Sequence, residues 1–431
     1  MSAQRRDESR LRMVFCDDEG RVYDHPELAM AGASGPRWLP VPWKETIPLP
    51  QGSAIVAMPG RLAVGYEPRR ESFVCLGEVE GSGPVAPAAA VLPPAYLRTL
   101  LPAQERPADA PPLPLLGYTA VGWARDGFRA AALRLDPSDR WDPRHFDTGD
   151  LPRRIEARQA TLAGNRIVDQ LAHCALDYHC YTAQNFFYQR WEAGVPTTPR
   201  CNARCAGCIS LQDGPCPSPQ ERLDFEPSGD EIAAVVGHHL AEADEPMVSF
   251  GQGCEGEPLL RAEAIAQALR QAGARTGHGT VNVNTNASRP DALALLADAG
   301  LDSVRITLAS ADPTRYDAYH RPDGYNICQV GQSFRLARER GLRVAANILV
   351  LPGATDTHEE TRCLVECLQR HRVDMVQLRN LSLDPDEALA ALRPAGPGRG
   401  VRRLLARLRR KLSGVPIGSF NRPVDRRGSA R

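Results

Sequence analysis

Hydrophobic positions between residues 194 and 381 follow two alternating patterns. Short runs rich in β-branched residues predict strands, and longer segments with apolar residues at helical spacing lie between them. Ser228–Glu231 and Thr357–Glu360 fit the capping box that opens a helix. The strand candidates are GVPTTP, PMVSFGQ, TVNVNTN, SVRITLAS, RVAANILVL and MVQLRNL. Six strands alternating with helices predict a parallel sheet joined by right-handed crossovers.

The first 150 residues show a shorter, hairpin-like alternation. RMVFCDDEGRVYDH and SAIVAMPGRLAVGY each place turn residues between two apolar runs. Residues 81–115 contain nine prolines, which predicts a linker or a surface loop there. We therefore expect a β-rich accessory domain over residues 1–150, and its sequence shows no catalytic constellation.

Three further regions complete the predicted organisation. Residues 151–190 form a helical connector, residues 191–385 the α/β core, and residues 386–431 a basic tail. Within the tail, a helix over 401–412 carries one apolar stripe, made of Val401, Leu404, Leu405, Leu408 and Leu412. From Arg393 to Arg431 there are twelve Lys or Arg residues against one acid. This helix is either docked by its leucines with a solvated basic face, or it also binds an acidic partner.

Composition narrows the class of protein. The 431 residues are 42% hydrophobic and 24% charged, with a formal net charge of +0, so bulk charge indicates neither nucleic acid nor another partner. The start of the chain lacks the apolar core of a signal peptide, and no apolar run reaches the ~18 residues of a membrane span. We expect a cytoplasmic protein whose cysteines are reduced.

Three cysteines follow the first predicted strand, in PRCNARCAGCIS at residues 199–210. Ligands bind at the carboxyl ends of strands in such folds, so Cys201, Cys205 and Cys208 lie at the expected site. Three thiolates can hold three irons of a four-iron cube and leave the fourth iron open. The alternative is a closed zinc site with Cys216 as the fourth ligand.

Several stretches in order resemble the radical S-adenosylmethionine (radical SAM) superfamily. The C-x-x-x-C-x-x-C spacing is followed by GCEGEPLL at 253–260 and VNVNTNAS at 281–288, and then by SVRITLAS and AANILVLPGATD. The resemblance covers roughly residues 190–385 and implies a partial (β/α)6 TIM-like barrel.

The resemblance also implies the chemistry and the cofactors. Cys201, Cys205 and Cys208 would hold a [4Fe-4S] cluster whose open iron is chelated by S-adenosyl-L-methionine. An electron passed to the cluster cleaves the sulfonium, and the 5′-deoxyadenosyl radical abstracts hydrogen from a substrate that the sequence does not identify. The electron donor would be an acidic flavodoxin or ferredoxin, which suits the basic tail.

Cofactor contacts are implied for seven further residues. Gly256 allows close approach, Glu257 lies at the edge that meets the methionyl amino group, and Arg305 suits the methionyl carboxylate. The ribose contacts are Asn284, Thr285 and Asn286, with Asn347 as an additional candidate near the carboxylate. Taken singly, these residues also fit a turn, a strand end or a structural ion pair.

Other residues have open interpretations. Gln377 and Arg379 share one face of the last strand, where they bind substrate or close the barrel. Cys254 and Cys216 lie near the predicted site, and Cys254 either contacts substrate or packs. Two cysteine pairs are expected in the core, namely Cys174 with Cys180 and Cys363 with Cys367. The alternative function is a non-catalytic zinc- or iron–sulfur-binding regulator.

Overall fold

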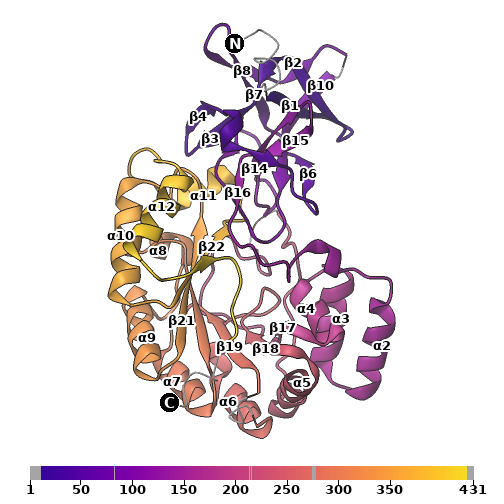
Figure 1. The fold of residues 1–431 in the computed structure, drawn as a ribbon, viewed down its shortest axis with the longest axis vertical. Coiled ribbons are helices and arrows are strands. Elements are labelled where there is room, and N and C mark those ends of the chain that lie inside the picture. The colour runs from indigo at the N-terminus through magenta and orange to yellow at the C-terminus, as the bar shows by residue number, and fades with distance from the viewer. Residues whose placement is uncertain (1–10, 82, 213, 215, 274–277, 425–431) are drawn as a thin grey trace.

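The computed structural model describes residues 11–81, 83–212, 214, 216–273 and 278–424. A β-rich N-terminal region stands above a half-barrel of parallel strands, and helices cover the outer face of the half-barrel (Figure 1). This arrangement confirms the predicted fold class, a partial TIM-like barrel preceded by a β-rich region.

The N-terminal region is built on an antiparallel sheet with the order β13–β7–β2–β1–β10–β14–β15–β5, to which β6, β8 and β9 add edge pairings. Its elements are β1 (Arg12–Asp17), β2 (Val22–Ala29), β3 (Ala31–Ser34), β4 (Arg37–Pro40), η1 (Trp43–Glu45), β5 (Ile47–Pro48), β6 (Ala54–Ala57), β7 (Leu62–Glu67), β8 (Ser72–Leu76), β9 (Glu78–Val79), β10 (Gly83–Val91), β11 (Tyr96–Arg98), β12 (Leu101–Pro102), β13 (Gln104–Glu105), β14 (Thr119–Ala124), β15 (Gly127–Ala130), β16 (Ala132–Arg134) and η2 (Pro143–His145).

The proline-rich stretch contains the central strand of this sheet. Strand β10 pairs with β1 through Phe15 and Pro87, and with β6 and β14 through its run of alanines. Proline still offers its carbonyl oxygen, and the Pro87 oxygen accepts a hydrogen bond from the Met58 N–H at 2.9 Å. Ala89 and Ala90 are fully buried. The prediction of a linker or surface loop is therefore wrong for residues 83–91.

Three helices connect the two parts: α2 (Leu151–Thr161), α3 (Arg166–Leu176) and α4 (Tyr181–Tyr188). The first barrel strand, β17 (Arg190–Gly194), begins two residues later. It precedes the predicted GVPTTP strand because Gln189, at φ 56°, ends α4 and turns the chain. Pro196 and Pro199 cannot donate ladder hydrogen bonds, so the register with β18 ends at Gly194. The predicted position of the first strand, GVPTTP, was therefore wrong by about one strand length.

The half-barrel pairs its strands in sequence order, all parallel, from β17 to β23. The remaining strands are β18 (Asp244–Phe250), β19 (Thr280–Thr285), β20 (Ser303–Leu308), β21 (Arg343–Val350), β22 (Met375–Asn380) and β23 (Ile417–Gly418). The helices are α5 (Gly229–Glu242), η3 (Pro258–Arg261), α6 (Ala262–Gln271), α7 (Pro290–Ala299), α8 (Pro313–His320), α9 (Ile327–Glu339), α10 (His358–Arg370), α11 (Pro385–Leu392) and α12 (Val401–Lys411). The C-terminal β23 thus adds a strand to the six that the pattern predicts.

Alternation along the strands separates two faces. Val283, Ile306 and Ile348 are fully buried in the cluster that packs on the helices, whereas polar residues occupy the intervening positions. The capping box at Ser228 forms as predicted. Thr357 caps α10, but the Glu360 carboxylate accepts a hydrogen bond from the Ser310 hydroxyl instead of closing a box.

Helix α12 is docked by its apolar stripe. Leu404, Leu405 and Leu408 are buried, and Arg402 donates to a carboxylate oxygen of Glu45 at 2.7 Å. Among the described residues, no helix combines the length and hydropathy that a bilayer crossing requires.

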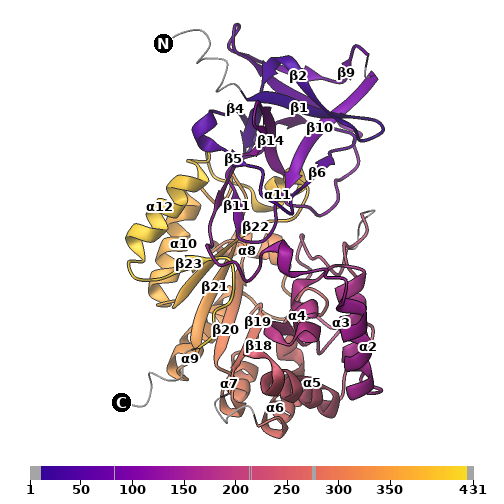
Figure 2. The same cartoon turned by 45° about the vertical axis from the view of Figure 1, so that its right-hand side comes forward.

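The N-terminal region covers the carboxyl ends of the last barrel strands, and β11 lies against β22 (Figure 2). Asn380, which ends β22, donates to the Tyr96 carbonyl and accepts from the Arg98 N–H. The fully buried Arg98 guanidinium donates to the carbonyls of Tyr118 and Leu381. The N-terminal region is therefore joined to the end of the barrel at which the cysteines lie.

Candidate functional site

The cysteine loop follows β17 and is held by backbone contacts. Gly256 donates its N–H to the Thr198 carbonyl at 2.7 Å, and Glu257 donates to the Arg200 carbonyl at 2.8 Å. A Cβ atom at position 256 would lie 1.9 Å from the Arg200 oxygen, so only glycine fits. The backbone that approaches Gly256 most closely is thus that of the cysteine loop.

The three cysteines lie within residues 201–208 of this loop. Burial raises the pKa of Cys201 to about 11. Burial also raises the pKa of Cys205, and the neighbouring Cys201 and Cys208 raise it further. The loop is closed by a hydrogen bond from the Cys208 N–H to the Cys205 carbonyl. In a four-iron cube each thiolate binds a different iron, so three thiols on one short loop that influence one another's charge fit such a group.

Two of these sulfurs receive side-chain donors from outside the loop. His320 Nε2 accepts the Ala309 N–H at 3.2 Å, so the proton of the neutral ring is on Nδ1. Nδ1 lies 3.3 Å from the Cys205 sulfur and donates to it. The Arg222 guanidinium donates to the Cys208 sulfur at 3.4 Å. Donors of this kind orient the ligands of a metal group and tune its potential.

Cys216 does not join the triplet as a fourth ligand. Its thiol donates to the Pro112 carbonyl at 3.3 Å. It lines, together with Cys205 and Cys208, a cavity of 280 Å³ between the cysteine loop, α11 and the N-terminal region. In the part of the chain that the structure describes, no three His, Cys, Asp or Glu side chains are grouped as a site for one metal ion.

Glu257 joins the ends of two strands beside the cysteine loop. Its carboxylate accepts from the Thr285 hydroxyl at 2.5 Å, the Asn286 N–H at 2.9 Å and the Leu259 N–H at 3.0 Å. Burial raises its pKa to about 7. The Asn286 amide donates to Asn202, next to Cys201. The structure therefore brings Glu257, Thr285 and Asn286 together with the triplet and engages their side chains in the fold.

Polar side chains line the interior of the half-barrel. Buried atoms there that lack a hydrogen-bond partner among the described residues are Asn284 Nδ2, Arg305 Nε, Asn347 Oδ1, Gln377 Oε1 and Arg379 Nε. Burial lowers the pKa of Arg305 to about 9, and the charge of Arg379 lowers it further. An unpaired buried polar group costs about 1–3 kcal/mol. Such a set of free donors and acceptors fits a polar ligand.

The buried carboxylate of Glu192, on β17, fixes how the interior amides are turned. A carboxylate only accepts, so the Ser249 hydroxyl donates to it at 2.6 Å and in turn accepts from Asn282 Nδ2 at 3.0 Å. Asn282 Nδ2 also donates to Asn284 Oδ1 at 2.9 Å. Asn284 Nδ2 is therefore left as a donor that faces the interior.

Sequence reasoning did not find Glu192, Arg222, His320 or Asn421. Arg222 and His320 reach the cysteines from 14 and 115 residues away in the sequence, so no local spacing indicates them. Glu192 lies on β17, and the hydrophobic pattern predicted this first strand a few residues further along the chain, at GVPTTP. Asn421 enters the barrel from the C-terminal segment.

The remaining cysteines lie away from the triplet. Cys254 is buried against Cys174, and a hydrogen bond between these thiols lowers the pKa of Cys174 to about 7. The structure thus places Cys254 in the core, as one of the two open interpretations expected. Cys363 and Cys367 are partly buried on α10.

Comparison with known proteins identifies the family. Residues 195–364 match the family model of the radical SAM superfamily. The half-barrel region of this chain is therefore a radical SAM core. Enzymes of this superfamily use a [4Fe-4S] cluster and S-adenosylmethionine, so the expectation of these cofactors is confirmed at the level of the family.

Among curated relatives, a GTP 3′,8-cyclase of Chlorobaculum tepidum is 30% identical over 179 residues, which cover 41% of this chain and 49% of the relative. GTP 3′,8-cyclase 2 of Mycobacterium tuberculosis is 30% identical over 215 residues, with 46% and 56% covered. The chain spans about half the length of these relatives.

Solved structures that are similar include Streptococcus suis SuiB bound to the precursor peptide SuiA, with a TM-score of 0.38 and 12% identity over 58% of this chain and 54% of that one. Methylornithine synthase (PylB) gives a TM-score of 0.37 and 14% identity over 62% of this chain and 84% of that one.

Proposed function

We propose that this radical SAM enzyme binds a [4Fe-4S] cluster through Cys201, Cys205 and Cys208, cleaves S-adenosylmethionine reductively and abstracts hydrogen from its substrate. The observation that carries the proposal is the placement of three cysteines on one short loop after β17, whose backbone accepts hydrogen bonds from Gly256 and Glu257 at the end of the half-barrel. The bound cluster supplies the one-electron reduction of the sulfonium. The protein's own residues hold the cofactor in place and keep water away.

The unpaired interior atoms suit S-adenosylmethionine. Arg305 offers a guanidinium to the methionyl carboxylate, and Asn347 Oδ1 offers an acceptor two residues along the neighbouring strand. Asn284 Nδ2 offers a donor to a ribose hydroxyl. Gly256, Glu257, Thr285 and Asn286 form the edge between these atoms and the cysteine loop.

Anaerobic reconstitution with iron and sulfide tests the proposal. We expect a brown protein whose electron paramagnetic resonance signal changes when S-adenosylmethionine is added, and which releases 5′-deoxyadenosine after reduction. A colourless protein that retains zinc would instead support the alternative, a non-catalytic regulator.

The donors to the two sulfurs give a prediction of their own. We expect His320→Leu to shift the midpoint potential of the reconstituted cluster to lower values, because an N–H donor stabilises the extra negative charge of the reduced cluster. His320→Gln, which keeps a donor, should restore part of the shift. A redox titration followed by electron paramagnetic resonance measures the potential.

A matched control is His239→Leu. His239 is a buried residue of α5, and its ring is hydrogen-bonded to the Trp191 carbonyl on β17. This control should leave the potential unchanged. Equal potentials in wild type and His320→Leu would show that the hydrogen bond to Cys205 does not tune the cluster.

We also propose an acidic electron donor, a flavodoxin or ferredoxin. The exposed Arg204 and Arg321 line the cavity that Cys205 and Cys208 also line, and their charge would attract such a donor near the cluster. In α12, Arg409 and Arg410 are exposed, whereas Arg402 is paired with Glu45.

We expect Arg204→Ser with Arg321→Asn to slow flavodoxin-driven turnover at low salt and to leave dithionite-driven turnover unchanged. Arg409→Ser with Arg410→Ser is the matched comparison, because it removes the same charge from the α12 surface. Slowing by the second pair alone would place the docking surface on α12, and identical rates with both reductants in all variants would contradict the proposal.

A further inference from the structure

The interior of the half-barrel holds two guanidinium groups without a hydrogen-bonded counterion among the described residues. Arg305 lies on β20 and Arg379 on β22, and the Nε atom of each is buried without a partner. Burial lowers the pKa of Arg379, while the charges of Glu192 and Asp136 act in the opposite direction.

Both neighbouring acids already have other partners. Glu192 Oε1 accepts from Ser249, Gln252 and Asn421. The Asp136 carboxylate accepts the N–H groups of Ser138 and Ser419. The Nε atom of each arginine is buried without an acceptor, while the side chain as a whole keeps partial exposure. Each guanidinium can therefore receive an anion that enters the half-barrel.

Hydrogen bonds from the C-terminal segment fix which way the side-chain amide of Gln377 is turned. Asn421 Nδ2 donates to Glu192 Oε1 at 2.6 Å, because a carboxylate accepts only. Asn421 Oδ1 must then accept, and it does so from Gln377 Nε2 at 2.8 Å. The other end of the amide, Gln377 Oε1, is thereby fixed as a free acceptor, and it is buried without a partner.

Gln377 and Arg379 point to the same face of β22, and this face meets the C-terminal segment. Gly418 pairs with Gln377 in the sheet, and the Arg379 guanidinium carbon lies 5.9 Å from the centre of the Phe420 ring. A cation over an aromatic face is held in a defined direction. The segment therefore builds one wall of the interior rather than only ending the chain.

Resting on the function proposed above, we propose that Arg379 and Gln377 bind the substrate, and that the substrate carries an oxyanion next to a hydrogen-bond donor. The planar guanidinium takes a carboxylate or phosphate through two parallel N–H groups. Gln377 Oε1 accepts from a hydroxyl or amino group beside that anion. With Arg305 assigned to the methionyl carboxylate, each interior cation has its own anion.

The experiment compares anions with neutral molecules of the same shape. Isothermal titration calorimetry on the reconstituted enzyme with S-adenosylmethionine, at fixed ionic strength, uses lactate against lactamide and glycerol 3-phosphate against glycerol. We expect at least one anion to bind about tenfold or more tightly than its neutral counterpart. Preference for lactate identifies a carboxylate substrate, and preference for glycerol 3-phosphate identifies a phosphate.

The variants separate the two arginines. We expect Arg379→Gln to lose that preference and to keep its affinity for S-adenosylmethionine, whereas Arg305→Gln weakens S-adenosylmethionine binding. Arg338→Gln is the matched control, because Arg338 is exposed on α9 and paired with Asp374. If Arg379→Gln does not fold, Arg379→Lys keeps the charge without the fork and should lose part of the preference.

Two results would overturn the inference: no anion preferred over its neutral counterpart in wild type, or an unchanged preference in the Arg379 variants. The proposed function fails by a different result, the absence of 5′-deoxyadenosine from wild-type enzyme. Titration of the same probes into the metal-free chain measures the anion preference whether or not the enzyme releases 5′-deoxyadenosine.

Discussion

Replacing Cys201, Cys205 or Cys208 by alanine is expected to reduce the release of 5′-deoxyadenosine to background. In the proposed site each thiolate would hold a different iron of the cluster, so loss of one would leave two ligands for the whole group. Chromatographic assay of 5′-deoxyadenosine after dithionite reduction measures the effect, and iron content per chain shows whether the cluster assembles.

The chain contains matched controls for this result. Cys363→Ala and Cys367→Ala change partly buried thiols on α10 and should leave cleavage intact. Cys216→Ala is the sharper control, because Cys216 lines the same cavity as Cys205 and Cys208 but donates to Pro112. Loss in Cys216→Ala equal to that in the triplet would indicate a four-thiol site, and cleavage in all three triplet variants would refute the cluster assignment.

The core strands could be predicted because local pattern and tertiary role agree in them. In TVNVNTN the valines face the helices and the asparagines face the interior, so alternation alone identifies strand β19. The cysteine spacing and the Glu257 turn could likewise be noticed in the sequence, since each is a short segment with its own chemistry.

Other features depend on contacts between distant segments. Pro87 disfavoured a strand, yet β10 is central because its alanines allow close packing of β1, β6 and β14. His320 acts on Cys205 only through the fold, and Asn421 reaches Glu192 across 229 positions of sequence. The roles of the interior amides follow from a chain of hydrogen bonds, which no single sequence position encodes.

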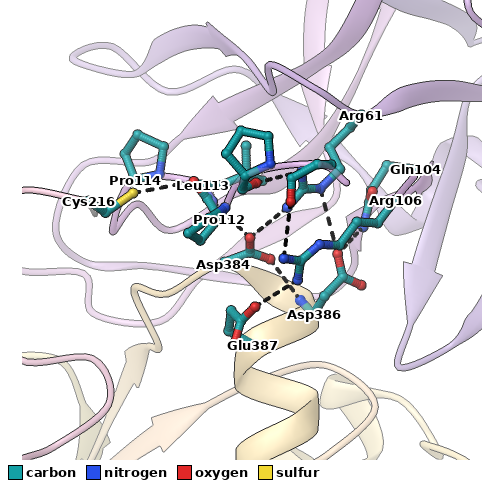
Figure 3. Close-up of polar contacts among 12 residues, drawn as sticks. Arg61, Gln104, Arg106, Pro112, Leu113, Pro114, Cys216, Asp384, Asp386 and Glu387 are labelled. Carbon is teal, nitrogen blue, oxygen red and sulfur yellow. Dashed lines mark hydrogen bonds and ion pairs between the residues drawn. The ribbon is translucent and has the colours of Figure 1, made fainter. Parts of the chain in front are cut away.

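The buried ion pair between Arg61 and Asp384 is the largest expected contributor to the attachment of the N-terminal region (Figure 3). Arg61 Nη2 lies 2.7 Å from Asp384 Oδ2, and both side chains are at most 1% exposed. The same Asp384 oxygen accepts the Leu113 N–H, and its other oxygen accepts the Asp386 N–H that opens α11. This pair joins the N-terminal region to the barrel beside the 280 Å³ cavity.

Arg61→Ala is expected to lower the free energy of unfolding by about 3–5 kcal/mol, because it leaves a buried carboxylate without its cation. Urea unfolding of the chain measures this change. Arg61→Met with Asp384→Asn should lose less, since asparagine still accepts from Leu113 and caps α11 while no charge is stranded. Arg106→Ala is the control, as its pair with Glu387 is partly exposed and should be worth about 0–1 kcal/mol. If the single and double variants lost equal stability, packing of the Arg61 side chain, and not its charge, would hold the two parts together.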